Sequence, residues 1–171
     1  MYPQILHMHQ IEFIPIIFGD KAEVYSYRID NDRLSEYHKF VAQFKDTKDK
    51  FLANDFQRIA LAINRMASDG VLERFFRPEG HARDRVYAIP LEIIDWDKTK
   101  HGTLRVYCIR VSETLLIVGG GGLKTTDNYD VDPTLLTIVE TLQAIDAELM
   151  ELEDDGVVIE TEVINLKLYI E

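Results

Sequence analysis

The clearest pattern in the chain is a pair of short apolar runs separated by a polar break. Residues 104–111 and 114–118 are rich in aliphatic and β-branched side chains, and Ser112 and Glu113 mark the break between them. Two such runs around a short polar break predict an antiparallel β-hairpin with a tight turn. This hairpin is the best-defined part of the expected sheet.

The second run leads into four consecutive glycines, residues 119–122, which are followed by Lys124 and Thr125. Because glycine lets a partner approach the backbone closely, Gly122, the lysine and the hydroxyl indicate a site for an anion. The run fits neither of the two common phosphate-binding motifs, since Leu123 separates the glycines from the lysine and no βαβ unit surrounds it. A bent or bulged strand end is the alternative explanation for four glycines in a row.

Helical periodicity marks two consecutive segments before this hairpin. Residues 35–44 carry apolar side chains at helical spacing, with Ser35 as the expected N-cap. A longer helix is predicted over residues 49–68, closed by a glycine C-cap signal at Gly70. Its apolar stripe, which repeats about every 3.6 residues, consists of Phe51, Leu52, Phe56, Ile59, Ala60, Ala62, Ile63 and Met66. Two adjacent helices of this kind predict a helical hairpin.

A third helix is predicted after the glycine run, from Asp132 to about Glu153. Asp132 can cap this helix, and Pro133 occupies the favoured first position. The apolar face consists of Leu136, Val139, Leu142, Ile145, Leu149 and Leu152. Residues 157–170 then alternate between apolar and polar side chains, which predicts a last strand at a sheet edge.

The remaining segments complete an α+β pattern. Residues 1–29 are expected to be extended, with a turn at 19–21 and a strand over 23–28, and two further strands are expected over 72–77 and 84–90. We therefore predict an α+β fold. It has a small antiparallel sheet with an N-terminal helical hairpin on one face, a C-terminal helix and a terminal strand.

Composition indicates a single domain over residues 1–171. With 46% hydrophobic residues, the chain can bury one full core. No apolar run approaches the roughly 20 residues that a membrane helix needs, and the apolar residues 11–18 are too short and lack the basic flank of a signal peptide. The single cysteine, Cys108, excludes an internal disulfide. We expect a soluble cytoplasmic protein without a membrane partner.

Charge is unevenly distributed around a formal net charge of −11. Residues 71–126 hold nine Lys or Arg and seven Asp or Glu, whereas residues 127–171 hold one and thirteen. The acidic C-terminal extension, about residues 146–171, can be a solubilising face, can lie against the basic middle, or can bind a partner. A nucleic-acid binder usually carries a stronger basic patch than this middle segment does.

The tripeptide Arg-Val-Tyr occurs twice, beginning at Arg85 and at Arg105. Side chains two apart in a strand share a face, so Arg85, Tyr87, Arg105 and Tyr107 would line one sheet surface if the two strands are neighbours. Arginine binds phosphate through a bidentate fork, and tyrosine stacks on a base or transfers a proton. The alternative is two half-buried strands with charged residues at their rims.

Neither a metal nor a cofactor is expected. His7 and His9 share a strand face, but the other three histidines fall on different predicted elements and no second motif converges on them. Cys108 has no catalytic base at a motif spacing and is expected in the core.

The order of these elements resembles the RelE/ParE superfamily of bacterial toxin–antitoxin modules, nearest to its RelE- and HigB-type ribonuclease toxins. In that family a strand is followed by a helical hairpin, a short antiparallel sheet and a C-terminal segment, and residues 23–145 follow this order. The stretch 102–107, Gly-Thr-Leu-Arg-Val-Tyr, resembles the family's third strand. Residues 115–126 resemble the fourth, which ends in glycine, a basic residue and hydroxyls, and Tyr129 matches a tyrosine that follows.

The resemblance implies a metal-independent endoribonuclease that acts on translated mRNA at the ribosome. Its inhibitor would be an antitoxin protein, for which a helix-turn-helix protein is one candidate. Arg105 would then stabilise the phosphate, Lys124 would neutralise charge on the cleaved phosphate, and Tyr129 would stack on a base or transfer a proton. Arg85 is the basic residue nearest to the family's preceding strand. Two alternatives remain: a catalytically inactive relative that binds proteins, and an unrelated α+β interaction or regulatory module.

Overall fold

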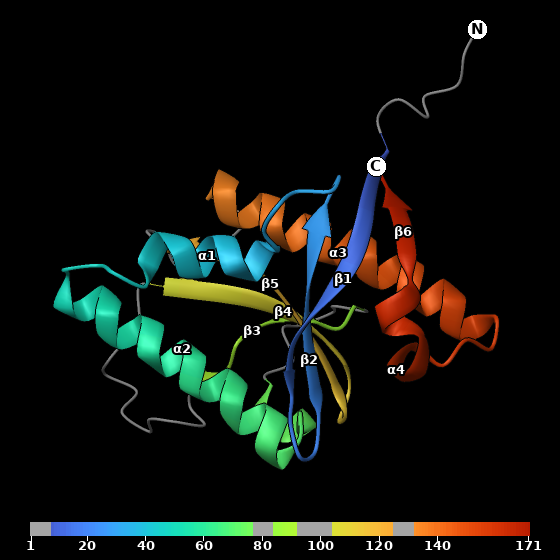
Figure 1. Cartoon of the computed structure of the whole chain (residues 1–171), viewed down its shortest axis with the longest axis horizontal. Coiled ribbons are helices and arrows are strands. Elements are labelled where there is room, and N and C mark those ends of the chain that lie inside the picture. The colour runs from blue at the N-terminus through green and yellow to red at the C-terminus, as the bar shows by residue number, and fades with distance from the viewer. Residues whose placement is uncertain (1–7, 77–83, 92–103, 125–131) are drawn as a thin grey trace, which may run out of the picture.

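The computed structural model describes residues 8–76, 84–91, 104–124 and 132–171 (Figure 1). One six-stranded sheet, in the order β3-β4-β5-β2-β1-β6, forms its centre. The strands are β1 (His9–Phe18), β2 (Glu23–Ile29), β3 (Val86–Ala88), β4 (Leu104–Ser112), β5 (Leu115–Leu123) and β6 (Lys167–Ile170). The helices are α1 (Glu36–Phe44), α2 (Lys50–Asp69), α3 (Pro133–Asp154) and α4 (Ile159–Glu162), with 3-10 turns η2 (Glu73–Phe75) and η5 (Val163–Asn165). The predicted α+β class is confirmed.

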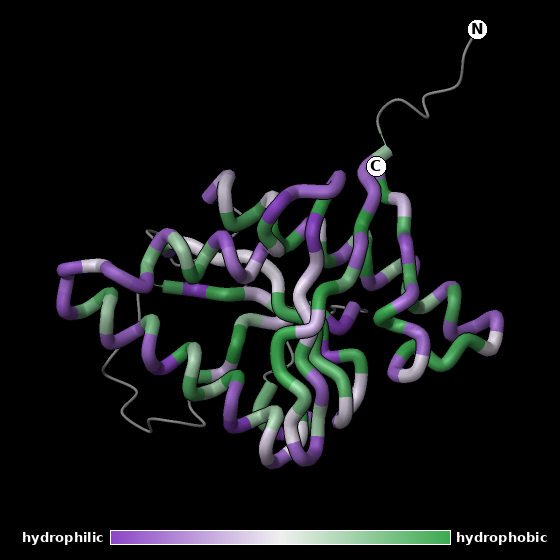
Figure 2. Tube along the Cα trace, viewed as in Figure 1, coloured by the Kyte–Doolittle hydropathy of each residue, from purple (hydrophilic) through white to green (hydrophobic). Residues whose placement is uncertain are grey.

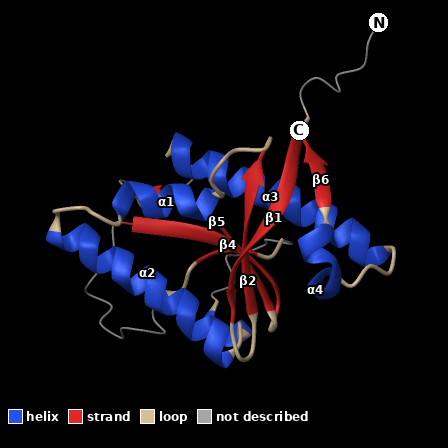
Figure 3. Cartoon of the chain, viewed as in Figure 1, coloured by secondary structure: helices blue, strands red, loops and turns tan. Residues whose placement is uncertain are grey.

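Helices flank both faces of the sheet, and each face has its own apolar core (Figure 3). On one face, α1 and α2 pack over β4, β5 and β2 in a cluster that includes Phe40, Ile63 and Val106. On the other face, α3, α4 and η5 pack in a cluster that includes Tyr107 and Leu142. Strands buried on both faces carry apolar side chains in both directions, and residues 115–118 of β5 are apolar and buried throughout. Along the central strands of Figure 2, apolar (green) segments are interrupted by polar (purple) and white ones.

Two hairpins, β1–β2 and β4–β5, meet at the middle of the sheet. All neighbouring strands run antiparallel except β2 and β5, which run parallel. A parallel pair needs a long crossover connection, and α1, α2, β3 and β4 supply it here. The expectation of a wholly antiparallel sheet is therefore wrong at this one junction.

Side-chain caps begin all three long helices. Ser35, Asp49 and Asp132 are the N-caps of α1, α2 and α3, and each accepts hydrogen bonds from backbone N–H groups of the first turn. These groups have no partner inside the helix, so a cap stabilises the helix start by about 1 kcal/mol. At the other end of α2, Gly70 adopts φ +106°, a conformation that favours glycine. The three predicted helices are confirmed within one or two residues.

Two strand predictions are wrong. Residues 73–75 form the turn η2, in which the N–H groups of Phe75 and Phe76 donate to carbonyls three residues earlier. The alternating segment after α3 forms α4 and η5, and only Lys167–Ile170 is a strand. Its alternation also places Ile159 and Val163 four residues apart, and both are buried, so the same pattern serves one face of a short helix. The remaining strand lies at the sheet edge, as predicted.

No helix in the described part of the chain is both long enough and apolar enough to cross a membrane.

Candidate functional site

Arg105 and Lys124, the predicted phosphate-binding residues, lie at the same end of the β4–β5 hairpin. Arg105 pairs with Gly122 across the two strands, and Lys124 follows two residues after Gly122. Alternation along an extended chain therefore assigns both cations to one sheet face. That face is the one covered by α3, because Leu135 lies 3.7 Å from the Cβ position of Gly122. We term Arg105, Gly122 and Lys124 the cationic corner.

Both backbone polar groups of Leu104, at the start of β4, form hydrogen bonds with side chains. Arg105 donates from Nη1 to the carbonyl of Leu104 at 3.0 Å. The N–H of Leu104 donates to Oδ2 of Asp55 on α2 at 3.2 Å. Asp55 in turn lies beside Arg58, with 3.7 Å between Oδ1 and Nη1. These contacts fix the strand that carries Arg105 against α2.

The apolar stripe predicted for α2 did not include Asp55 and Arg58, which are buried in the structure. Asp55 and Arg58 are 5% and 7% exposed, whereas Phe51, assigned to the apolar stripe, is 82% exposed. A buried acid and base three apart on one helix can satisfy each other. That spacing was the only signal in the sequence, and it is too common to identify a buried pair.

The glycine run forms the second half of β5. Three side chains of α3 at helical spacing, Leu135, Ile138 and Leu142, lie against Gly122, Gly120 and Gly119, respectively. At Gly119 an added Cβ would lie only 3.1 Å from Leu142, so the missing side chains let α3 approach the strand closely. The glycines therefore serve packing of the helix against the sheet.

A carboxylate beside the glycines argues against an anion on their backbone. Oε2 of Glu36, in the first turn of α1, lies 3.8 Å from the Cβ position of Gly120. The register of β4 and β5 also shifts between Val106 and Cys108, as expected for a bulged strand end. The bulge explanation therefore fits the glycines themselves, and the candidate anion site is confined to the cationic corner.

Gly121→Ala is expected to lower the free energy of unfolding by about 1–3 kcal/mol, because its Cβ would meet the carbonyl oxygen of Arg105 at 2.2 Å. The matched control is Gly122→Ala, whose Cβ has nothing nearer than 3.7 Å and which we expect to be nearly neutral. Urea unfolding of both variants measures the difference. Equal stability of the two would contradict the close approach of the β4 backbone to Gly121.

Arg85, a predicted substrate-binding residue, is bound to α3 instead of the cationic corner. Its Nη2 lies 2.8 Å from Oδ1 of Asp146 and 2.7 Å from Oε1 of Glu153. Its Nε and its backbone N–H also donate to Asp146, both at 2.9 Å. Burial lowers the pKa of the Arg85 guanidinium, but hydrogen bonds to Glu153 and Asp146 outweigh burial and raise it above its usual value. Arg85 therefore stays charged in this internal ion pair.

The two Arg-Val-Tyr strands are neighbours, but their four side chains do not share a surface. Tyr87 pairs with Cys108 rather than with Tyr107, and a register offset of one residue moves a side chain to the opposite face. Tyr87 accordingly packs on the α1–α2 side, with its ring centroid 5.0 Å from that of Phe76. Tyr107 is buried on the α3 side. The shared-surface prediction is wrong for this reason.

Two further predicted site residues, Thr125 and Tyr129, lie outside the described residues.

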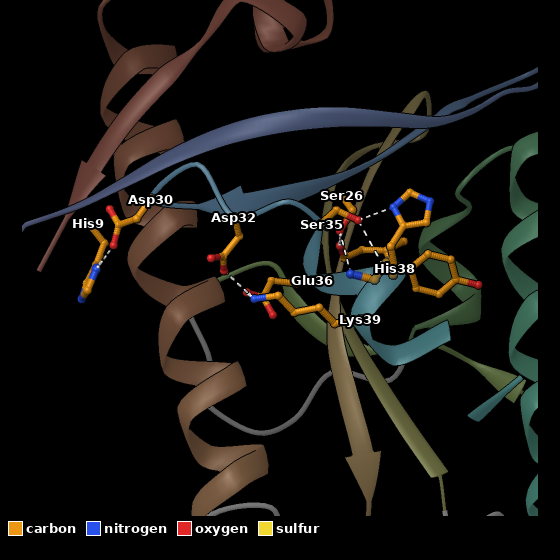
Figure 4. Close-up of polar contacts among 10 residues, drawn as sticks. His9, Ser26, Asp30, Asp32, Ser35, Glu36, His38 and Lys39 are labelled. Atoms are coloured by element: carbon orange, nitrogen blue, oxygen red, sulfur yellow. Dashed lines mark hydrogen bonds and ion pairs between the residues drawn. The ribbon is translucent and has the colours of Figure 1, made fainter. Parts of the chain in front are cut away.

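A second group of polar side chains surrounds the start of α1 (Figure 4). Oγ of Ser35 lies 2.6 Å from Nδ1 of His38 and accepts the backbone N–H of His38 at 3.1 Å. Ser35 is buried, and Ser26 beside it accepts the N–H of Tyr37 and donates to the carbonyl of Val118. In the part of the chain that the structure describes, no carboxylate orients His38. These contacts cap α1 and fasten it to the sheet.

Cys108 and the acidic residues offer no alternative chemistry. Burial raises the pKa of the Cys108 thiol and outweighs a smaller lowering by a backbone hydrogen bond with Tyr87, so the sulfur stays protonated and lies in the core as predicted. Across residues 8–76, 84–91, 104–124 and 132–171, no group of three or more His, Cys, Asp and Glu side chains is placed to hold a metal ion.

No family model, curated protein or solved structure matches this chain.

Proposed function

We propose that the protein is a toxin-like, metal-independent endoribonuclease that cleaves mRNA, at the ribosome in the cytoplasm, and is inhibited by a partner antitoxin. The order β2, α1–α2, β3–β4–β5, α3 is the order that the resemblance to RelE- and HigB-type toxins implies. This order supports the proposal without identifying the chemistry. The chemistry depends on the cationic corner.

The observation that carries the proposal is the β4–β5 register, which pairs Arg105 with Gly122 and brings Lys124 to the same face. Residues two apart along a strand are separated by about 7 Å, so two cations offset in this way can both reach the oxygens of one phosphodiester. A guanidinium can form two parallel hydrogen bonds to a phosphate, and an ammonium adds a second positive charge.

Such a pair suits cleavage by the RNA's own 2′-hydroxyl. The 2′-oxygen forms a bond to phosphorus, the bond from phosphorus to the 5′-oxygen breaks, and the proton of the 2′-hydroxyl is taken up while the 5′-oxygen gains one. The products are a 2′,3′-cyclic phosphate and a 5′-hydroxyl. Arg105 and Lys124 would stabilise the extra negative charge of the pentacovalent phosphate, and Tyr129 is the proposed group for base stacking or proton transfer.

A second candidate is a catalytically inactive relative that binds proteins. The observation in its favour is that α3 covers the sheet face of the cationic corner, with Leu135 against Gly122, while Arg85 is held by Asp146 and Glu153. A helix in this place restricts access of RNA to the face. Cleavage assays separate the two candidates directly.

Induction of the wild-type chain in a bacterial host is expected to arrest growth, with new RNA ends inside translated messages. Co-expression of the antitoxin gene should relieve the arrest. With purified protein and ribosomes carrying an mRNA, cleavage should leave a cyclic phosphate end, and chelation of metal during the quench and analysis should not alter the ends formed. Growth arrest without RNA cleavage would support a protein-binding role. The absence of both growth arrest and RNA cleavage would contradict both candidate functions.

A further inference from the structure

Among the described residues, no strand pairs with the outer edge of β6. This strand pairs on one side with β1, through His9 to Glu12, and it is the last strand in the sheet order. An edge strand presents unpaired N–H and C=O groups that can pair with a strand of another chain. Figure 1 shows β6 and α4 together at the outer side of the sheet.

Several large apolar side chains in β6 and its neighbouring segments are exposed. They belong to β6 itself, to η5, to the N-cap of α4 and to the residue before β1: Tyr169, Ile164, Val158 and Met8. Exposed apolar groups favour contact with a protein surface. The partner must also suit the charges that flank the strand.

Those charges select a second copy of this chain. Lys167 begins β6 and Glu171 follows it, both are exposed, and neither has an ion-pair partner among the described residues. Glu12, which faces Lys167 across the β1–β6 pair, is already bound by Arg28 and by Gln10. One strand thus carries a base at its start and an acid at its end.

Geometry limits how two copies of β6 can pair. A two-fold axis perpendicular to the sheet keeps each side chain on its own face, so residues opposite one another must both be odd-numbered or both be even-numbered. An antiparallel pair can therefore be centred on Leu168, Tyr169 or Ile170. Of these, only the register centred on Tyr169 places Lys167 opposite Glu171 of the second copy. By symmetry, Glu171 of the first copy then also lies opposite Lys167 of the second.

We propose that the protein forms a homodimer in which β6 pairs with β6 of a second copy, with the two-fold axis at Tyr169. In this register the two Tyr169 side chains lie opposite each other on the exposed face. Leu168 lies opposite Ile170 of the other copy, so the apolar clusters under α3 become continuous across the interface. A lysine on a strand edge discourages pairing when it meets a like charge, but here it meets a carboxylate.

A cross-linking experiment tests the register. Cys108 is the only cysteine in the chain and is buried, so an introduced thiol is the only accessible one. Residues opposite each other in an antiparallel pair have Cα atoms about 4.5–5.5 Å apart, which a disulfide can span. Y169C should form a disulfide-linked dimer under mild oxidation, whereas the control K167C, which faces position 171, should not. Equal cross-linking of both, or of neither, would overturn the proposal.

A charge exchange tests the energetics in solution. K167E and E171K each turn both cross-strand attractions into repulsions, and each should weaken dimerisation by about tenfold or more in sedimentation velocity. A mixture of the two variants restores both attractions, so the mixed dimer should form as tightly as the wild-type dimer. K48E changes the net charge equally at an exposed position between α1 and α2 and should leave dimerisation unchanged.

A wild-type chain that remains monomeric up to high micromolar concentration would overturn the proposal. A dimer that K167E and K48E weaken equally would also overturn it, since the interface would then not include β6. Neither outcome depends on ribonuclease activity.

Discussion

Asp146→Ala is expected to lower the free energy of unfolding by about 3 kcal/mol. Asp146 is fully buried on α3 and accepts three contacts from Arg85, two from the guanidinium and one from the backbone N–H. Removing one partner of a buried ion pair typically costs about 3–5 kcal/mol, because the other charge is left without compensation. Arg85 keeps Glu153 and is 21% exposed, which places the expected loss at the lower end.

Two further variants show whether the loss comes from the unpaired charge. Glu153→Ala removes the more exposed carboxylate, with 37% of its side chain accessible, and should cost about 1 kcal/mol or less. Replacing both charges by apolar side chains, as Arg85→Met with Asp146→Leu, should recover much of the stability lost in Asp146→Ala. Urea unfolding of the wild type and the three variants gives the four free energies of unfolding. Asp146→Ala and Glu153→Ala of equal stability would show that the buried carboxylate does not anchor β3 to α3.

Local chemistry predicted most of the helices, the β4–β5 hairpin, and the turn and strand at the start of β2. A side-chain cap and an apolar stripe are encoded within one turn of helix, so α1, α2 and α3 could be located from Ser35, Asp49 and Asp132 and the residues behind them. The prediction of a strand over the α4 segment was wrong because the spacing of Ile159 and Val163 is compatible with both a strand and a helix. Length and local pattern alone do not distinguish these for a four-residue element.

Long-range pairing could not be read from the sequence. The parallel β2–β5 junction joins segments about 90 residues apart, and the pairing of Tyr87 with Cys108 is set by the whole sheet. Arg85 and Asp146 lie 61 positions apart. The sequence predicted the strands of the candidate site and placed Arg105 and Lys124 near each other, but it could not reveal that Arg85 and Tyr87 are used elsewhere.

Arg105→Ala is expected to slow RNA cleavage by about 10²–10³-fold, because it removes charge-assisted hydrogen bonds to the phosphate in the transition state. Arg105→Lys keeps the positive charge but loses the bidentate fork, so it should be similarly impaired. Losing the hydrogen bond from Arg105 to the carbonyl of Leu104 should itself cost about 1 kcal/mol, so the free energy of unfolding is measured for both variants beside the cleavage rate.

A matched control separates loss of charge from loss of the site. Arg74 is exposed, lies in η2 and stacks on Phe75 with 5.3 Å between its Cζ and the ring centroid. Arg74→Ala removes the same charge far along the chain from the cationic corner and should leave cleavage unchanged. A purely structural Arg105 would give the opposite pattern, with an unstable alanine variant and a lysine variant that behaves as wild type.

The most direct measurement is the single-turnover rate at which purified protein cleaves ribosome-bound mRNA, compared between wild type and Arg105→Lys and corrected for the folded fraction. Our proposal predicts a rate at least about 10²-fold lower for Arg105→Lys, with an unfolding transition that coincides with that of the wild type. A stably folded Arg105→Lys or Arg105→Ala protein that cleaves RNA at the wild-type rate would contradict the assignment of the cationic corner as the catalytic site.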